Sequence, residues 1–161
     1  MKYKIIDNFL EKNQFLQLQN LICSDSFAWY LVNGVNNIGD GSYQLVHSIY
    51  KSYKVNSIFF DNLKPIIDKL KPKALIRIKA NFIAKTNKII EHGYHTDFTY
   101  PNSKTAVYYI NSNNGYTKFK KGGFVSESKE NKIIIFKSNE LHTGSSCTDS
   151  QYRIVLNINY F

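Results

Sequence analysis

Three side chains in the second half of the chain have the types and the spacing of a metal site. His95 and Asp97 are two residues apart, so on an extended strand both point to the same face and can reach one ion. A third ligand is required, because His-x-Asp pairs are common by chance. His142 is the candidate, since it follows an apolar run, Lys132–Phe136, that has the character of a buried strand. We therefore expect one divalent ion at His95, Asp97 and His142.

Two histidines and one carboxylate on one face leave coordination positions open, as in the facial triad of non-haem Fe(II) oxygenases. Arg153 lies eleven residues after His142, at the start of the last predicted strand. Arg153, Val155, Asn157 and Asn159 share one face of that strand, and Ile154, Leu156 and Ile158 share the other. A face with one arginine and two asparagines indicates a polar pocket. Arg153 is suited to bind the far carboxylate of a dicarboxylic acid whose other end chelates the metal.

The elements that position these residues are mainly strands. A short strand is predicted at Lys2–Ile6, then a helix capped by Asp7 or Asn8, and a second helix over Ser57–Leu70 with Pro65 inside it. From Ala74 onward, apolar and polar residues alternate and Gly, Asn and Ser turns separate the segments, which is typical of a sandwich or jelly roll. The predicted strands are Phe27–Val32, Tyr43–Tyr50, Ile76–Ile83, Thr105–Asn111, Tyr116–Phe119, Phe124–Ser126, Lys132–Phe136 and Tyr152–Tyr160.

These motifs together resemble the 2-oxoglutarate- and Fe(II)-dependent oxygenases, closest to the prolyl-hydroxylase-like branch and to short phage-encoded members. The order His95, Asp97, His142, Arg153 matches the family's order. Three segments, 107–111 (Val-Tyr-Tyr-Ile-Asn), 115–119 (Gly-Tyr-Thr-Lys-Phe) and 141–144 (Leu-His-Thr-Gly), are similar to prolyl-hydroxylase motifs. The resemblance covers roughly residues 75–161. Ile83 stands where many members carry a tyrosine, so no role is carried over there.

The resemblance implies a mainly β (α+β) fold, a double-stranded β-helix (jelly roll) with supporting N-terminal helices. It implies one oxygenase domain over residues 1–161, with helical support and outer strands in 1–72 and the metal-binding core in 73–161. It also implies Fe(II) as the metal, 2-oxoglutarate as cosubstrate and O2 as oxidant. Arg153 and Tyr109 are the expected cosubstrate residues, and Thr117 and Asn81 are further candidates for the pocket lining.

The implied reaction is hydroxylation of an unactivated C–H bond, by a prolyl-hydroxylase-like enzyme that acts on a peptide or protein. A small-molecule or free amino-acid hydroxylase on the same site is the alternative. A non-catalytic jelly-roll binding module is a further one, although such a module has no need of all four site residues. His92 is expected to be a loop histidine and His47 a structural one. For Arg77, one of only two arginines, a role that needs the planar guanidinium and a role as a solvent-facing or ion-paired strand residue are both left open.

Composition limits the remaining classes. The net charge of +9 suggests a nucleic-acid partner, but 19 of the 21 basic residues are scattered lysines. Lys, Ile, Asn, Tyr and Phe share A/T-rich codons, so a skewed genome accounts for much of this charge and nucleic acid is an unlikely partner. Two cysteines without motif spacing, no apolar leader and no apolar run of membrane-spanning length predict a cytoplasmic protein without a membrane partner, in the host cytoplasm if the chain is phage-encoded.

Overall fold

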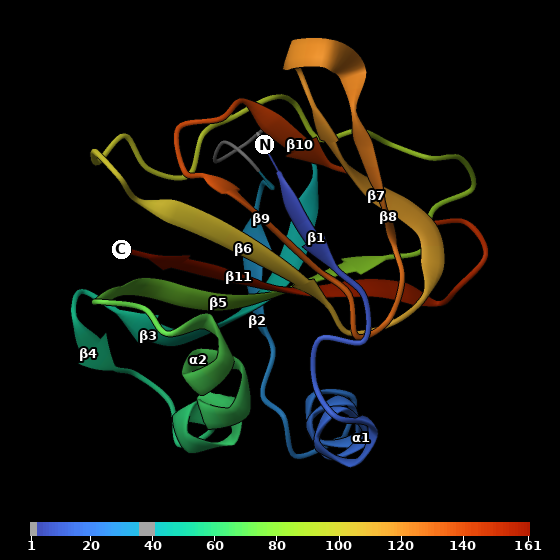
Figure 1. Cartoon of the computed structure of the whole chain (residues 1–161). Helices are drawn as coiled ribbons and strands as arrows, with labels where there is room; N and C mark the ends of the chain where they lie inside the picture. Colours follow the sequence, from blue (N-terminus) through green and yellow to red (C-terminus); the bar gives the residue numbers. More distant parts are fainter. Residues whose placement is uncertain (1–2, 36–40) are drawn as a thin grey trace.

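The computed structural model describes residues 3–35 and 41–161 and consists of two antiparallel sheets and two helices (Figure 1). The larger sheet has eight strands in the order β1-β9-β6-β11-β5-β3-β2, with β4 paired to β3, and the smaller has the order β10-β7-β8. The strands are β1 (Lys4–Ile6), β2 (Tyr30–Asn33), β3 (Tyr43–Lys51), β4 (Lys54–Val55), β5 (Leu75–Ala84), β6 (Lys104–Tyr109), β7 (Asn113–Phe119), β8 (Val125–Ser128), β9 (Ile133–Lys137), β10 (His142–Gly144) and β11 (Tyr152–Tyr160).

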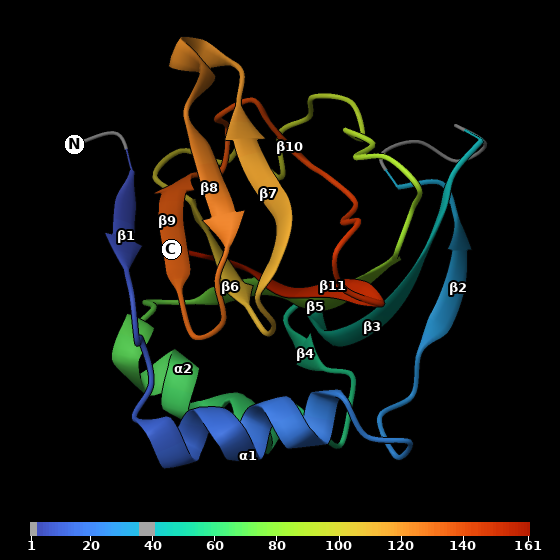
Figure 2. The ribbon, with the colours of Figure 1, turned by 90° about the vertical axis from the view of Figure 1, so that its right-hand side faces the viewer.

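The helices cover one face of the larger sheet, and the smaller sheet lies over the other face (Figure 2). Helix α1 (Lys12–Ile22) buries Phe15, Leu18 and Ile22, the stripe that its sequence pattern predicts. Helix α2 (Lys64–Leu70) follows a short 3-10 helix (Phe60–Leu63). Pro65 lies in the first turn of α2, where its missing N–H has no intrahelical acceptor to lose. The predicted helix is therefore divided just before the proline. No helix of the described residues is long and apolar enough to span a membrane.

The predicted cap of α1 is wrong. Glu11, and not Asp7 or Asn8, occupies the N-cap position, and no side chain caps the helix. Asn8 adopts a left-handed conformation with φ of 48°, and the backbone N–H of Phe9 donates to the carbonyl of Asn131. The chain therefore turns between β1 and α1 through contacts with residues far along the sequence, which a local pattern cannot reveal.

The hydrophobic core is divided by the larger sheet. The main cluster lies between that sheet and the helices and includes Ile78, Ala80, Leu156 and Ile158 of β5 and β11. A smaller cluster lies between the two sheets, and it consists of Val107, Tyr109, Phe119, Ile134, Phe136 and Val155. The inner space of the sandwich is thus filled by apolar side chains at one end only.

Strands β5 and β11 carry opposite chemistry on their two faces. Their register pairs Arg153 with Ile83, Val155 with Asn81, Asn157 with Lys79 and Asn159 with Arg77. Because side chains alternate along a strand, these residues share the face turned toward the smaller sheet, and the alternating apolar residues face the helices. The polar face predicted from the sequence of the last strand is therefore present, and β5 extends it.

Candidate metal and cosubstrate site

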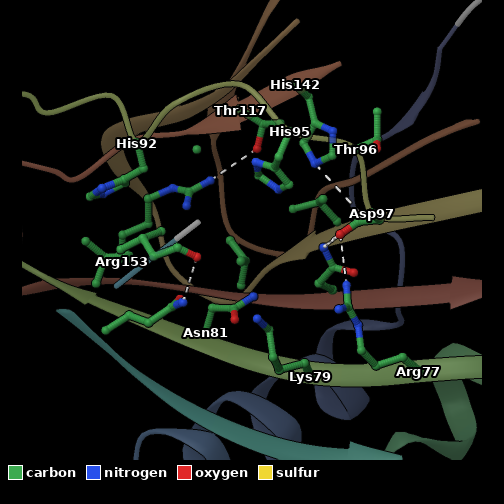
Figure 3. Close-up of a pocket in the computed structure, with 17 residues that line it drawn as sticks. Arg77, Lys79, Asn81, His92, His95, Thr96, Asp97, Thr117, His142 and Arg153 are labelled. Carbon is green, nitrogen blue, oxygen red and sulfur yellow. Dashed lines mark hydrogen bonds and ion pairs between the residues drawn. The ribbon is translucent and has the colours of Figure 1, made fainter. Parts of the chain in front are cut away.

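A pocket of about 280 Å³ lies between the two sheets, beside the smaller apolar cluster. Its lining residues come from β5, the segment before β6, β6 itself, the smaller sheet and β11, together with Val35 and with Gln44 of β3 (Figure 3). The lining consists of Val35, Gln44, Arg77, Lys79, Asn81, Ile83, His92, His95, Thr96, Asp97, Val107, Thr117, His142, Gly144, Arg153, Val155 and Asn157.

The three predicted metal ligands meet in this pocket. One ligating atom of His95, of Asp97 and of His142 lies within 4.8 Å of the others. Two backbone hydrogen bonds join His95 and His142, which are far apart in the sequence. The N–H of His95 donates to the His142 carbonyl over 2.9 Å, and the His95 carbonyl accepts from the His142 N–H over 3.0 Å. The sequence predicts that His95 and Asp97 lie on an extended strand. In the structure, neither residue belongs to a regular strand. One isolated bridge to β10 holds His95, and the Asp97 N–H donates to the Ser138 carbonyl.

Each imidazole presents Nε2 toward a common point. His142 Nδ1 lies 2.9 Å from the carbonyl oxygen of Glu140, a contact that places the proton on Nδ1 and leaves Nε2 free to ligate. His142 Nε2 is 3.8 Å from Asp97 Oδ2. His95 Nδ1 makes a longer contact of 3.5 Å with the Gly93 carbonyl. Such contacts on the outer nitrogen fix the tautomer and the ring orientation of metal-binding histidines.

The Asp97 carboxylate is held by three neighbours. Arg77 Nη2 donates to Oδ1 over 2.8 Å, and Thr105 Oγ1 donates to Oδ2 over 2.8 Å. The amide of Asn157 lies 3.3 and 3.2 Å from the two oxygens. Asn159 orients two of these donors: its amide oxygen accepts from Arg77 Nε over 3.0 Å, and its amide N–H donates to Thr105 Oγ1 over 2.9 Å. Arg77 is therefore ion-paired to Asp97, one of the possibilities that its sequence left open, and it also lines the pocket.

The protonation states suit metal binding. Burial opposes ionisation of Asp97, but the charges of His142 and Arg77 and the hydrogen bonds from Thr105 and Asn157 outweigh it, and the pKa of Asp97 falls below its usual value. Burial, together with His142, lowers the pKa of His95. A carboxylate and a neutral imidazole are the forms that ligate a metal ion.

Arg153 is buried at the other end of the pocket, with 4% of its surface exposed. Its Nε donates to Ser128 Oγ over 2.8 Å and its Nη2 to Thr117 Oγ1 over 3.2 Å. The guanidinium carbon lies 5.7 Å from the ring centre of Tyr109. A Cβ at Gly115 would lie 2.6 Å from Arg153 Cδ and 2.7 Å from the Ser146 carbonyl oxygen, so only glycine fits beside the arginine.

The other predicted cosubstrate residues are placed differently. Thr117 and Asn81 line the pocket, and Asn81 Oδ1 is buried with no hydrogen-bond partner among the described residues. Tyr109 is fully buried under Arg153, is not among the lining residues, and donates its hydroxyl to the Ser126 carbonyl over 3.1 Å. A direct contact between Tyr109 and oxoglutarate therefore stays a prediction.

Among the other histidines, His92 lies in a loop, as predicted, but its side chain lines the pocket. His47 is buried away from it, with Nδ1 2.6 Å from the Ala28 carbonyl and Nε2 2.8 Å from Ser57 Oγ, as expected for a structural histidine.

Lys79 is a pocket residue that was not predicted from the sequence. Its position between Arg77 and Asn81 on the polar face of β5 was the available signal. The sequence also predicts two mobile segments at the pocket mouth, residues 33–41, which are rich in Gly and Asn, and Phe98–Lys104, which follows Asp97. The first lies partly outside the described residues, although Val35 near its start lines the pocket. The second expected border, Phe98–Lys104, starts beside Asp97, and the Arg77 guanidinium lies 5.0 Å from the ring centre of Phe98.

Comparison with known proteins gives a match at the level of structure only. No family model and no curated protein sequence matches the chain. An oxidoreductase of the 2OG-Fe(II) oxygenase family from Burkholderia pseudomallei superposes with a TM-score of 0.73 at 12% identity, over 99% of this chain and 85% of that one. A viral collagen prolyl hydroxylase from Paramecium Bursaria Chlorella virus-1, in its 2OG complex, gives 0.62 at 15% identity, over 99% and 96%.

A third similar structure is the epimerase SnoN in complex with Fe3+, alpha ketoglutarate and nogalamycin RO. It gives a TM-score of 0.69 at 10% identity, over 99% of this chain and 78% of that one. The predicted double-stranded β-helix with supporting helices is thereby confirmed. The fold is therefore the one that the motif resemblance implied, since the similar structures include a 2OG-Fe(II) oxygenase and a viral prolyl hydroxylase.

Proposed function

We propose that the chain is an Fe(II)- and 2-oxoglutarate-dependent dioxygenase that hydroxylates an unactivated C–H bond, in the manner of prolyl hydroxylases, on a peptide or protein. One observation carries this proposal: three ligating side chains and a buried arginine share a single pocket. The fold alone does not determine an activity, because one fold serves many functions. The four side chains His95, Asp97, His142 and Arg153 therefore form the basis of the assignment.

The donor set fits Fe(II). Two imidazole nitrogens and one carboxylate oxygen bind this ion and leave positions for other ligands. His95 and His142 would each ligate through Nε2. Asp97 would ligate through Oδ2, because this oxygen lies 3.8 Å from His142 Nε2, whereas Oδ1 is ion-paired to Arg77. These outer contacts fix the ligands before the ion binds, which lowers the reorganisation that binding requires.

The Arg153 end fits the distal carboxylate of 2-oxoglutarate. Hydrogen bonds to Ser128 and Thr117 use two of the five N–H donors of the guanidinium and hold its plane. Burial in a site without a carboxylate of its own favours capture of one from a ligand. Thr117 thus orients Arg153, and the ring of Tyr109 supports it from the side away from the pocket.

Bound Fe(II) and 2-oxoglutarate would supply the oxidising chemistry, in which O2 converts oxoglutarate to succinate and CO2 and transfers its second oxygen atom to the substrate C–H bond. The residues of this chain bind and orient the reactants. They also limit the space: about 280 Å³ is at the lower end of ligand pockets, and the cosubstrate takes part of it. What remains fits one side chain of a peptide or a small molecule.

The decisive experiment is turnover of oxoglutarate. The protein is loaded anaerobically with Fe(II) and 2-oxoglutarate, exposed to O2, and assayed for succinate by mass spectrometry, alone and with proline-containing peptides or free amino acids. We expect succinate from the wild type and none from Asp97→Ala, while Asp61→Asn, at an exposed carboxylate of the 3-10 helix, behaves as the wild type. Absence of succinate from the iron-loaded wild type with every substrate would contradict the proposal.

The alternative of a small-molecule or free amino-acid substrate is tested in the same assay. A product gaining one oxygen atom from a free amino acid, with none from peptides, assigns the chain to this second class. Two observations support the small-molecule alternative: the small volume of the pocket, and the structural similarity to an epimerase solved with a small-molecule ligand.

A further inference from the structure

Lys79 lies in the middle of β5 with its side chain directed into the pocket. Figure 3 shows Lys79 and Asn81 rising from β5 on the side opposite His95. The side chain is largely withdrawn from solvent, and the structure gives its ammonium group no hydrogen bond or ion pair with any described residue. Its cross-strand neighbour is Asn157, whose amide N–H groups are turned to Asp97 instead.

This part of the pocket holds other polar atoms that are not satisfied. Asn81 Oδ1 and Asn157 Oδ1 are buried, and neither has a partner among the described residues. Arg77 and Arg153, in contrast, are both hydrogen-bonded within the protein. Withdrawing an ammonium group from water costs free energy unless a partner replaces the water. Since no described residue supplies such a partner, a molecule that enters the pocket is the source that we consider for Lys79.

The charge of the lining defines that molecule. Among the described lining residues, Arg77, Lys79 and Arg153 are cationic and Asp97 is the one carboxylate, so their charges leave an excess of two positive charges. Fe(II) brings two positive charges and 2-oxoglutarate two negative ones, which cancel. The fully loaded pocket would thus keep the same excess. A third ligand that carries a negative charge is favoured there over a neutral one.

Lys79 can supply this charge near neutral pH. Burial lowers the pKa of Lys79 to about 8; Arg77 acts in the same direction and Asp97 opposes it. At pH 7 the amine is therefore still mostly protonated. A bound anion would raise this pKa again and stabilise the charged form.

We propose that Lys79 recognises the substrate itself, by binding a carboxylate or a similar anionic group that the substrate carries close to the carbon to be hydroxylated. This inference rests on the proposed function and deepens it. The favoured substrates are then an acidic residue or its neighbour in a peptide, or a free carboxylic or amino acid. Neutral isosteres, such as amides in place of carboxylates, are disfavoured because they leave the ammonium unpaired.

The carboxylates of 2-oxoglutarate are the other source of the same chemistry, so the experiment separates the two. The protein is prepared with lysine labelled by ¹³C at the ε position, loaded with diamagnetic Zn(II) and observed by NMR. The resonance that Lys79→Met removes is that of Lys79, and the other lysines serve as internal controls. 2-Oxoglutarate is added to saturation first, and acetate or its neutral isostere acetamide is then titrated at constant ionic strength.

We expect a saturable shift of the Lys79 resonance with acetate in the oxoglutarate-saturated protein, and none with acetamide. The affinity for 2-oxoglutarate should fall by less than tenfold in Lys79→Met, since only the general attraction of one positive charge is lost, and it should not change in the matched surface variant Lys54→Met, at an exposed residue of β4. A tenfold or greater loss of oxoglutarate affinity in Lys79→Met would instead make Lys79 a cosubstrate residue and overturn the inference. No response to acetate, or equal responses to acetate and acetamide, would also overturn it.

The failure of the inference is distinguishable from the failure of the proposed function. Succinate formation in the iron-loaded wild type tests the function without reference to Lys79. If succinate forms and acetate does not shift the Lys79 resonance, only the proposed anion-binding role of Lys79 is contradicted. If neither oxoglutarate binding nor succinate is detected, the proposed function fails, and the role of Lys79 fails with it.

Discussion

Two parts of one pocket are built in opposite ways. At the metal end, Asp97 receives hydrogen bonds from Arg77, Thr105 and Asn157 before any ion is bound. On the floor, the half-buried Lys79 has no such bond from the described residues, and the buried Asn81 Oδ1 is likewise unpaired. The first part is organised by the fold itself, whereas the second depends on a ligand for its partners.

Both parts use the same two strands, so the difference comes from the cross-strand partners. Arg77 faces Asn159, and the amide oxygen of Asn159 directs the guanidinium toward Asp97. Lys79 faces Asn157, whose side-chain amide donates to Asp97 and not to a group near Lys79. Preorganised metal ligands and an unsatisfied recognition surface are what an enzyme needs when the ion is constant and the substrate enters and leaves.

The largest effect is expected at the preorganised end. Asp97→Asn keeps the shape of the side chain but removes its charge and presents N–H groups to the donors around it. Affinity for Mn(II) or Fe(II) should fall by more than the roughly 100-fold that loss of an outer partner can cost. Calorimetric titration of the metal measures this, with Asp61→Asn as the control. An unchanged affinity in Asp97→Asn would exclude the carboxylate as a ligand.

A smaller effect is expected from Arg153→Lys. Lysine keeps the positive charge but lacks the planar fork and the two hydrogen bonds to Ser128 and Thr117. Affinity for 2-oxoglutarate should fall by about 10- to 100-fold, the equivalent of one charge-assisted hydrogen bond. Oxoglutarate titration of the Zn(II)-loaded protein measures this. The metal affinity of the same variant should not change, and a parallel loss of both would indicate a folding defect instead of a lost cosubstrate contact.

The sequence revealed much of this site because its residues alternate. The polar and apolar faces of β11, and the apolar helix-facing residues of β5, were readable from side-chain order alone. The meeting of His95, Asp97 and His142 was expected from their types and their order. Strand β10 was missed because its three residues are too few for a periodic signal.

Other features depend on contacts that no local pattern contains. The Arg77–Asp97 ion pair joins residues 20 positions apart and exists only because β5 passes under the segment that carries Asp97. The need for glycine at position 115 comes from Arg153, on another strand. Whether Lys79 has a partner depends on where Asn157 turns its amide, which only the three-dimensional arrangement decides.

Arg77→Gln tests how much of the preorganisation comes from the outer partners. Glutamine cannot supply the charge that lowers the pKa of Asp97, although its amide can still donate a hydrogen bond. Metal affinity at pH 7 should fall by about tenfold, at the lower end of the range for outer partners. The loss should grow as the pH falls, because the carboxylate of the variant protonates at a higher pH than that of the wild type. Equal affinities for the wild type and Arg77→Gln across the pH range would show that Arg77 does not contribute to the preorganisation of Asp97.

The smallest effect concerns the stability of the ligand-free protein. The folded pKa of Lys79 is about 8, against 10.5 for an ordinary lysine. Between these values the unfolded chain binds more protons than the folded one, so stability rises with pH; below pH 8 the full cost of burying the charge is present. Lys79→Met removes this cost and should stabilise the metal-free protein at pH 7. Raising the pH to 9 should reduce that advantage by roughly 1 kcal/mol, since the wild type can then release the proton.

Urea unfolding of both proteins at the two pH values measures the difference, and Lys54→Met should show no such pH dependence. If the stability difference between Lys79→Met and the wild type is the same at both pH values, Lys79 finds a partner inside the folded chain, and the contrast between the two parts of the pocket disappears.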